Sequence, residues 1–176
     1  KFFEIALKAD NDGYPVFPLI PGTKRPIHDG GFHNATRDEE QIRAWWTENP
    51  NANIGVPTGR ISGISAVDVD GPEGVESIRQ TFGSLPVTRV HGTPHGNHLV
   101  YKHDALFYGR NGTLPGVDIK TDGGYLVWPG SIVDCDKPER CNDHDPEYKV
   151  TRDIQPISIG QVPEVFRKEY KHKVTD

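Results

Sequence analysis

The clearest structural signal in the chain is the stretch ISAVDVD at residues 64–70, which a Gly-Pro pair ends at once. An apolar run of this length, closed by two turn residues, predicts a buried strand. Because side chains alternate across a strand, Asp68 and Asp70 are expected on one face, with Cα atoms roughly 6.6 Å apart. The sequence therefore predicts two neighbouring carboxylates at the end of a core strand.

Two carboxylates in an Asp-x-Asp pair suit hard divalent cations, which prefer oxygen ligands. The reaction that most needs such a pair is nucleotidyl or phosphoryl transfer with two metals about 3.5–4 Å apart. The same pair also occurs in glycosyltransferases that hold a nucleotide-sugar diphosphate, in phosphohydrolases, and as solvated charge at strand ends. Taken alone, Asp68 and Asp70 leave the choice between a metal site and surface charge open.

Composition indicates one globular unit in 176 residues. The net charge of −5 argues against a protein that coats nucleic acid by bulk electrostatics. It does not exclude a polymerase, because bound metals reverse the sign of the charge locally. No apolar segment approaches the ~20 residues of a membrane span, and no signal-peptide pattern opens the chain, so we expect a cytoplasmic protein without membrane contact.

The spacing of apolar and turn residues predicts an α+β domain rather than a fully wound parallel sheet. Helices are expected at residues 2–9, from a capping box at Thr36 to about Asn49, and at 72–82. Strands are expected at 16–20, 54–56, 64–70, 87–90, 98–101, 116–120 and 125–128. The chain contains neither a Gly-x-x-x-x-Gly-Lys-Ser/Thr loop nor a Gly-x-Gly-x-x-Gly fingerprint, so a P-loop ATPase is excluded from this segment.

Further motifs follow the two carboxylates in a fixed order. The segment TPHGNHLVY at residues 93–101 starts a strand with His98 after a tight turn, and GVDIK at 116–120 supplies a third acid, Asp118. Together with GGY at 123–125 and PGS at 129–131, this order resembles the bifunctional primase/polymerase domain of the archaeo-eukaryotic primase superfamily, found in phage and plasmid replication proteins. The resemblance covers residues 5–135, including 22–26, 35–38, 44–46 and 53–56.

The resemblance implies a catalytic core with a mixed or antiparallel sheet of the RNA-recognition type, fused to an N-terminal α/β unit. It implies that Asp68, Asp70 and Asp118 bind Mg²⁺ or Mn²⁺ and that His98 binds the phosphates of the incoming nucleotide. Lys120 and Ser131 are expected to help bind that nucleotide. The family usually has a Ser-Gly-Gly-like turn before its histidine, whereas the turn here, HGN, lacks the serine.

Lys24 and Arg25 lie in a short basic loop between two prolines, which would present them rigidly. They are expected to contact nucleotide or template, with ordinary surface charge as the alternative.

Another feature is the spacing Cys135-x5-Cys141-x2-His144, which could supply three ligands of a structural zinc site. Free thiols or a disulfide are the alternatives for these two cysteines.

The functional expectation is a DNA-directed nucleotidyltransferase, a template-directed primase/polymerase of phage or plasmid replication in a bacterial or archaeal cell. Its partners would be single-stranded template, primer, dNTP or NTP, and a helicase domain in the same full-length chain. The catalytic domain is expected at residues 1–160, with 161–176 starting a linker or helical segment towards a further region. Two alternatives remain: a catalytically silent nucleic-acid-binding replication-initiator module, and a metal-dependent glycosyltransferase.

Overall fold

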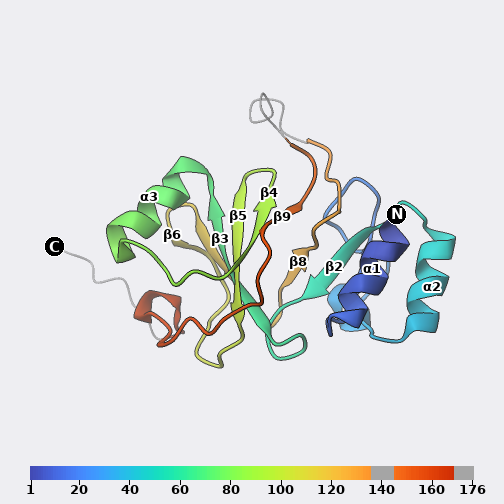
Figure 1. Cartoon of the computed structure of the whole chain (residues 1–176), viewed down its shortest axis with the longest axis horizontal. Helices are drawn as coiled ribbons and strands as arrows, with labels where there is room; N and C mark the ends of the chain where they lie inside the picture. Colours follow the sequence, from blue (N-terminus) through green and yellow to red (C-terminus); the bar gives the residue numbers. More distant parts are fainter. Residues whose placement is uncertain (136–144, 169–176) are drawn as a thin grey trace.

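The computed structural model describes residues 1–135 and 145–168, which form an α+β fold with two sheets, as predicted (Figure 1). Its helices are α1 (Phe2–Asn11), α2 (Glu39–Glu48) and α3 (Gly71–Phe82), with short 3₁₀ turns η1 (Gly31–Asn34) and η3 (Glu164–Phe166). The strands are β1 (Phe17–Leu19), β2 (Asn53–Pro57), β3 (Ile64–Asp70), β4 (Arg89–Thr93), β5 (Gly96–Lys102), β6 (Arg110–Leu114), β7 (Val117–Lys120), β8 (Tyr125–Val127) and β9 (Lys149–Arg152). None of the helices in these described ranges has the length and apolarity needed to cross a bilayer.

The N-terminal unit consists of a three-stranded sheet, in the order β1-β2-β8, with α1 and α2 beside it (Figure 1). β1 is an edge strand, which explains how it tolerates Pro18. The helix expected after Thr36 begins at Glu39 and is capped by Asp38, whose side chain accepts a hydrogen bond from the Glu40 amide at 3.0 Å. The cap is therefore two residues later than the capping box predicted.

The six-stranded sheet has the order β6-β7-β3-β5-β4-β9, and all of its strand pairs are antiparallel. β3 lies between β5 and β7, and α3 connects β3 to β4. The antiparallel pairing agrees with the mixed or antiparallel sheet that the resemblance implied. Strands β6 and β9 were not predicted, because neither RNGTL nor KVTR shows apolar alternation.

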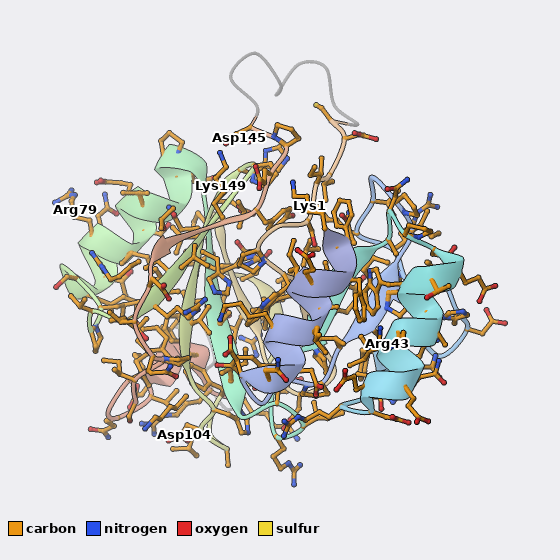
Figure 2. The ribbon with its side chains drawn as sticks, turned by 45° about the vertical axis from the view of Figure 1, so that its right-hand side comes forward. Lys1, Arg43, Arg79, Asp104, Asp145 and Lys149 are labelled. Atoms are coloured by element: carbon orange, nitrogen blue, oxygen red, sulfur yellow. The ribbon has the colours of Figure 1, made fainter. Side chains whose placement is uncertain are left out.

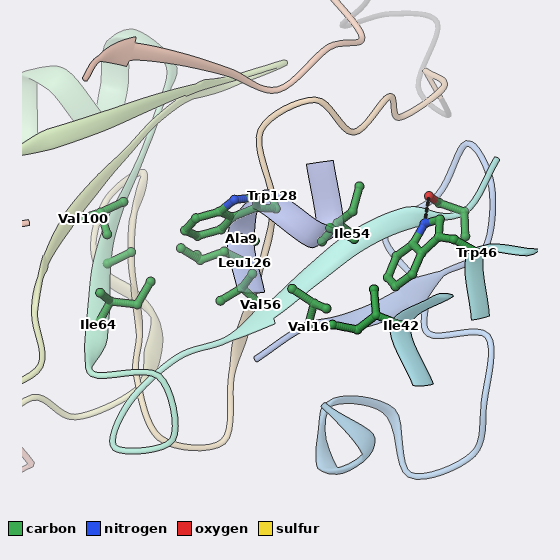
Figure 3. Packing of buried hydrophobic residues seen from close by; sticks show 13 residues of the cluster. Ala9, Val16, Ile42, Trp46, Ile54, Val56, Ile64, Val100, Leu126 and Trp128 are labelled. Carbon is green, nitrogen blue, oxygen red and sulfur yellow. Dashed lines mark hydrogen bonds between the residues drawn. The ribbon is translucent and has the colours of Figure 1, made fainter. Parts of the chain in front are cut away.

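A shared apolar core joins the two sheets. Figure 3 shows Ile54 and Val56 of β2 and Leu126 of β8 in the same cluster as Ile64 of β3 and Val100 of β5. Charged side chains cover the outside, such as Arg43 on α2 and Arg79 on α3 (Figure 2). The end of β3 that starts at Ile64 is therefore held against the N-terminal unit by continuous packing.

The opposite face of the six-stranded sheet packs against α3 and η3. Gly74 of α3 fits directly on the turn between β6 and β7, where a Cβ atom on Gly74 would lie 2.5 Å from the carbonyl oxygen of Gly116. The backbone amide of Asp70 also donates to that Gly116 carbonyl at 2.8 Å. This close approach fixes the end of β3 against the start of β7, the two strands that carry the predicted acids.

Candidate active site

Three carboxylates converge where β3 and β7 lie side by side. Asp68 is paired directly with Asp118 across these strands, and Asp70 follows two residues later on the same face. Each of the three contributes an oxygen atom to a group in which all such atoms lie within 4.8 Å of one another. The structure thus brings the three predicted acids together, at a spacing that suits a divalent cation.

His98 lies on β5, the strand on the other side of β3 from β7. It is paired with Asp68 across β3 and β5, and its Nε2 lies 3.6 Å from Asp68 Oδ2, an ion-pair distance rather than a hydrogen bond. Both side chains are largely buried, and Asp68 Oδ1 and His98 Nδ1 have no hydrogen-bond partner among the described residues. Buried polar atoms normally find a partner, so these two atoms suit a site that holds a ligand.

The electrostatics separate the two carboxylates of the Asp-x-Asp pair. Burial, the charge of Asp68 and the charge of Asp118 raise the pKa of Asp70 to about 6. Burial opposes ionisation of Asp68 too, but His98, Asp70 and Lys120 outweigh it and hold the pKa of Asp68 below its ordinary value. A bound divalent cation would relieve the repulsion between these acids.

Asp68 and Asp70 open into a pocket of about 350 Å³, and Asp118 lies beside them without lining it. Lys120 projects from β7 on the same face as Asp118, and Lys24 reaches the pocket from the loop after β1. That loop is anchored, because the Tyr125 hydroxyl donates to the Lys24 carbonyl at 2.7 Å. The full lining consists of Lys24, Asp68, Asp70, Thr93, His95, His98, Lys120, Gly123, Gly124, Tyr125, Val127 and Tyr148.

A second pocket, of about 360 Å³, adjoins the first and shares Lys24 and His95 with it. Arg25 lines this second pocket and not the first. The basic loop predicted from the sequence therefore lies between two neighbouring cavities. Lys24 lines both of them, and Arg25 lines only the second.

The structure does not support two of the predictions, the nucleotide contact of Ser131 and zinc ligation by Cys135. Ser131 is fully buried, and its hydroxyl accepts a hydrogen bond from the Ile54 amide at 3.1 Å, so it stabilises the connection between β2 and the segment after β8. Of the proposed zinc ligands, Cys141 and His144 lie outside the described residues. Cys135 is disulfide-bonded, and a disulfide sulfur is not the thiolate that zinc binds. Zinc ligation by Cys135 was therefore predicted wrongly, and the disulfide alternative holds for this cysteine.

The structure also adds pocket residues that the sequence did not suggest. Tyr148 is almost fully buried, and its ring centroid lies 6.2 Å from that of His98. Thr93 provides a hydroxyl in the turn that lacks the family's serine, where it accepts a hydrogen bond from the Gly96 amide at 3.0 Å. Thr93 and His95 could have been considered, because they flank the expected turn. Tyr148 gave no such signal, since only the fold brings it back to β5.

Comparison with known proteins agrees with this site. The model of one family, described as bifunctional DNA primase/polymerase, N-terminal, matches residues 6–164. No curated protein matches the chain. Since the family match takes in nearly the whole chain and all of the residues that form the acidic pocket, this protein belongs to the family of bifunctional DNA primase/polymerase N-terminal domains.

Proposed function

We propose that this protein is a template-directed DNA primase/polymerase that joins nucleotides by two-metal catalysis. The observation that carries the proposal is the group of three carboxylates beside a buried histidine, at a pocket that Asp68, Asp70, His98 and two lysines line. Membership of the family supports a nucleotidyltransferase that acts on DNA and nucleotides. Phage or plasmid replication, and a helicase domain in the same full-length chain, are proposed from the resemblance alone.

The donor set fits Mg²⁺ or Mn²⁺. Asp68, Asp70 and Asp118 offer only carboxylate oxygens, which are the hard ligands these ions prefer, and Asp68 Oδ1 is buried and lacks a partner among the described residues. When bound, the cations would lower the pKa of the attacking 3′-hydroxyl and neutralise charge on the leaving pyrophosphate. The clustered carboxylates therefore favour cation binding at this site, whatever the net charge of the whole chain.

The remaining pocket residues are proposed to bind the incoming dNTP or NTP. His98 lies at the floor beside Asp68, where its imidazole can donate to a phosphate oxygen. Lys120 reaches the pocket from β7 and Lys24 from the loop after β1, and both would neutralise negative charge on the rest of the triphosphate. Arg25, which lines the adjoining pocket, is proposed to contact template, primer or an extended phosphate chain. Ser131 is not included, because its hydroxyl is already used inside the fold.

Two other functions remain to be separated by experiment. A silent nucleic-acid-binding module would retain the fold but would have no need for three clustered acids. A metal-dependent glycosyltransferase is disfavoured, because all of the strand pairs that the described residues form within the two sheets are antiparallel and offer no parallel nucleotide-binding unit.

Primer extension tests the proposal. A primed template, labelled dNTP and Mg²⁺ or Mn²⁺ should yield extension by the wild-type chain and a loss above about a thousandfold in Asp68→Asn. Asp29→Asn is the matched control, because Asp29 is an exposed aspartate outside the described pocket lining and should leave the rate unchanged. More than a tenth of wild-type extension by Asp68→Asn, or DNA binding without extension by the wild type, would contradict the proposal.

A further inference from the structure

The third acid, Asp118, is held by the backbone of its neighbouring strand. The Gly112 amide in β6 donates a hydrogen bond to Asp118 Oδ1 at 2.7 Å. A short bond between an amide and a carboxylate is charge-assisted and stronger than one between neutral groups. One of the two oxygens of Asp118 therefore has a fixed partner within the protein.

A bulge in β6 makes this bond possible. Arg110 is paired with Ile119 and Leu114 with Val117, so β6 has two more residues than β7 between the same two pairings. The extra residues take the Gly112 amide out of the regular ladder and leave it free to face a side chain. Strand β6 is at the edge of its sheet, where such a bulge is easily accommodated.

Glycine at position 112 is required by conformation and not by space. Its φ is +63°, in the left-handed region, and a Cβ atom built there would have no neighbour within 4 Å. Residues with a side chain adopt this region at a cost of roughly 1–2 kcal/mol, Asn less than most. A change at Gly112 should therefore act through the position of its amide.

We propose that Gly112 and the β6 bulge are a positioning device for the metal ligand Asp118. The hydrogen bond to Oδ1 prevents rotation of the carboxylate, so the other oxygen keeps one place relative to Asp68 and Asp70. Preorganised ligands bind more tightly because less order has to be created on binding. This inference rests on the proposed function, in which Asp118 binds the catalytic cation.

A bulge in an edge strand has another known use, since it discourages pairing with a second molecule. In that case a change at Gly112 would alter stability or solubility and would leave metal affinity as it is. The two explanations therefore differ in a quantity that can be measured without catalysis.

The test is Mn²⁺ binding to the apo protein, followed by electron paramagnetic resonance, for four variants. Gly112→Ala should weaken binding roughly 10-fold, as is typical when the support of a metal ligand is lost. Gly112→Asn, which tolerates the left-handed region and keeps the amide, should stay within about threefold of wild type. Gly63→Ala is the matched control, because Gly63 has a φ of +77° and no neighbour within 4 Å of a Cβ, at the other end of β3.

Gly63→Ala should lose similar stability and keep wild-type Mn²⁺ affinity. Wild-type affinity in Gly112→Ala, or an equal loss in Gly63→Ala, would overturn the inference. Asp118→Asn separates this failure from failure of the proposed function. If Asp118→Asn also binds Mn²⁺ like the wild type, the metal site itself is misassigned; if it does not, only the role of Gly112 is wrong.

Discussion

The fold disfavours a negative charge on Asp70 when no metal is bound. Its pKa is raised to about 6 from an ordinary value of 3.8, by burial first and by Asp68 and Asp118 next. Between these two values the folded state binds more protons than the unfolded state, so the stability contributed by this group is lost as the pH rises through 6. Ionised Asp70 should therefore lower the free energy of unfolding of the metal-free protein at neutral pH.

The variant Asp70→Asn should stabilise the metal-free protein at pH 7, because it removes this disfavoured charge. The gain should be only about 1 kcal/mol, because Asp70 is partly exposed and solvent screens its charge. The gain should shrink as the pH falls from 7 to 4. Thermal unfolding in chelator checks this, and a repeat in Mn²⁺ should reverse the order, since only the wild type gains binding energy. A gain that grows on acidification would refute the sign.

His91 should respond to pH in the opposite way. It is fully buried beside His98, and Arg89 Nε donates to its Nε2 at 2.8 Å. Because arginine can only donate, the proton of His91 must be on Nδ1. Burial, together with the charges of Arg89 and His98, lowers the pKa of His91 to about 2.

The unfolded chain takes up a proton at His91 below about pH 6.5 and the folded chain does not, so this group costs stability as the pH falls. His91→Gln should therefore lose stability less steeply than the wild type between pH 6.5 and 4.5, although it starts lower because the contact with Trp128 is gone. Nitrogen chemical shifts of His91 should show a protonated Nδ1 and no titration above pH 4. A titration near pH 6 would disprove the assignment.

At the scale of single elements, Asn53 of β2 determines where the basic loop lies. Its side-chain amide donates to the Thr23 carbonyl at 2.9 Å and to the Ile132 carbonyl at 2.7 Å, and its oxygen accepts from the Ile132 amide at 2.9 Å. All of these bonds are made by a fully buried side chain. Lys24 therefore depends on Asn53 for its position at the pocket.

Replacing Asn53 by Asp should raise the KM for dNTP several-fold, because two donors are lost and the loop carbonyls then face a carboxylate. Mn²⁺ binding should be unchanged. Asn34→Asp is the matched control, since Asn34 makes a similar bond to the Asp29 carbonyl at 2.7 Å in an exposed turn. Equal KM values for the two variants, with both folded by circular dichroism, would show that the loop needs no such anchor.

For the whole molecule, the core extends further along the chain than residue 160, where the end of the catalytic domain was expected. Val162, Val165 and Phe166 are buried against α3, and the rings of Phe82 and Phe166 lie 5.3 Å apart. The Tyr108 amide also donates to the Phe166 carbonyl at 2.9 Å. We propose that the folded domain continues at least to Phe166.

A chain of residues 1–160 should consequently be less stable than one of residues 1–168, by more than the roughly 3–5 kcal/mol that removal of one buried phenylalanine side chain costs. Urea unfolding of both chains, beside residues 1–176, measures this difference. Equal midpoints for 1–160 and 1–168 would restore the boundary at residue 160.

Much of this organisation follows from local pattern. The run from Ile64 to Asp70 is apolar and ends in Gly-Pro, so strand and carboxylate positions are readable without a fold. His98 and Asp118 each lie in a short β-rich run next to a glycine turn, which makes their strands predictable. Strand β6 was missed because its residues have no apolar period, and its place is set only by pairing with β7.

The sequence by itself determined the α+β class and the strands on which Asp68, Asp70, Asp118 and His98 lie. Alternation within one strand and the turn residues beside it are local properties, so they can be read without the fold. Only the tertiary structure decided which strands are neighbours, and hence that Asp118 and His98 flank Asp68. It also brought Tyr148 to the pocket, buried Ser131 and aimed the Gly112 amide at Asp118. These contacts join residues distant in the chain or depend on backbone geometry that residue type does not specify.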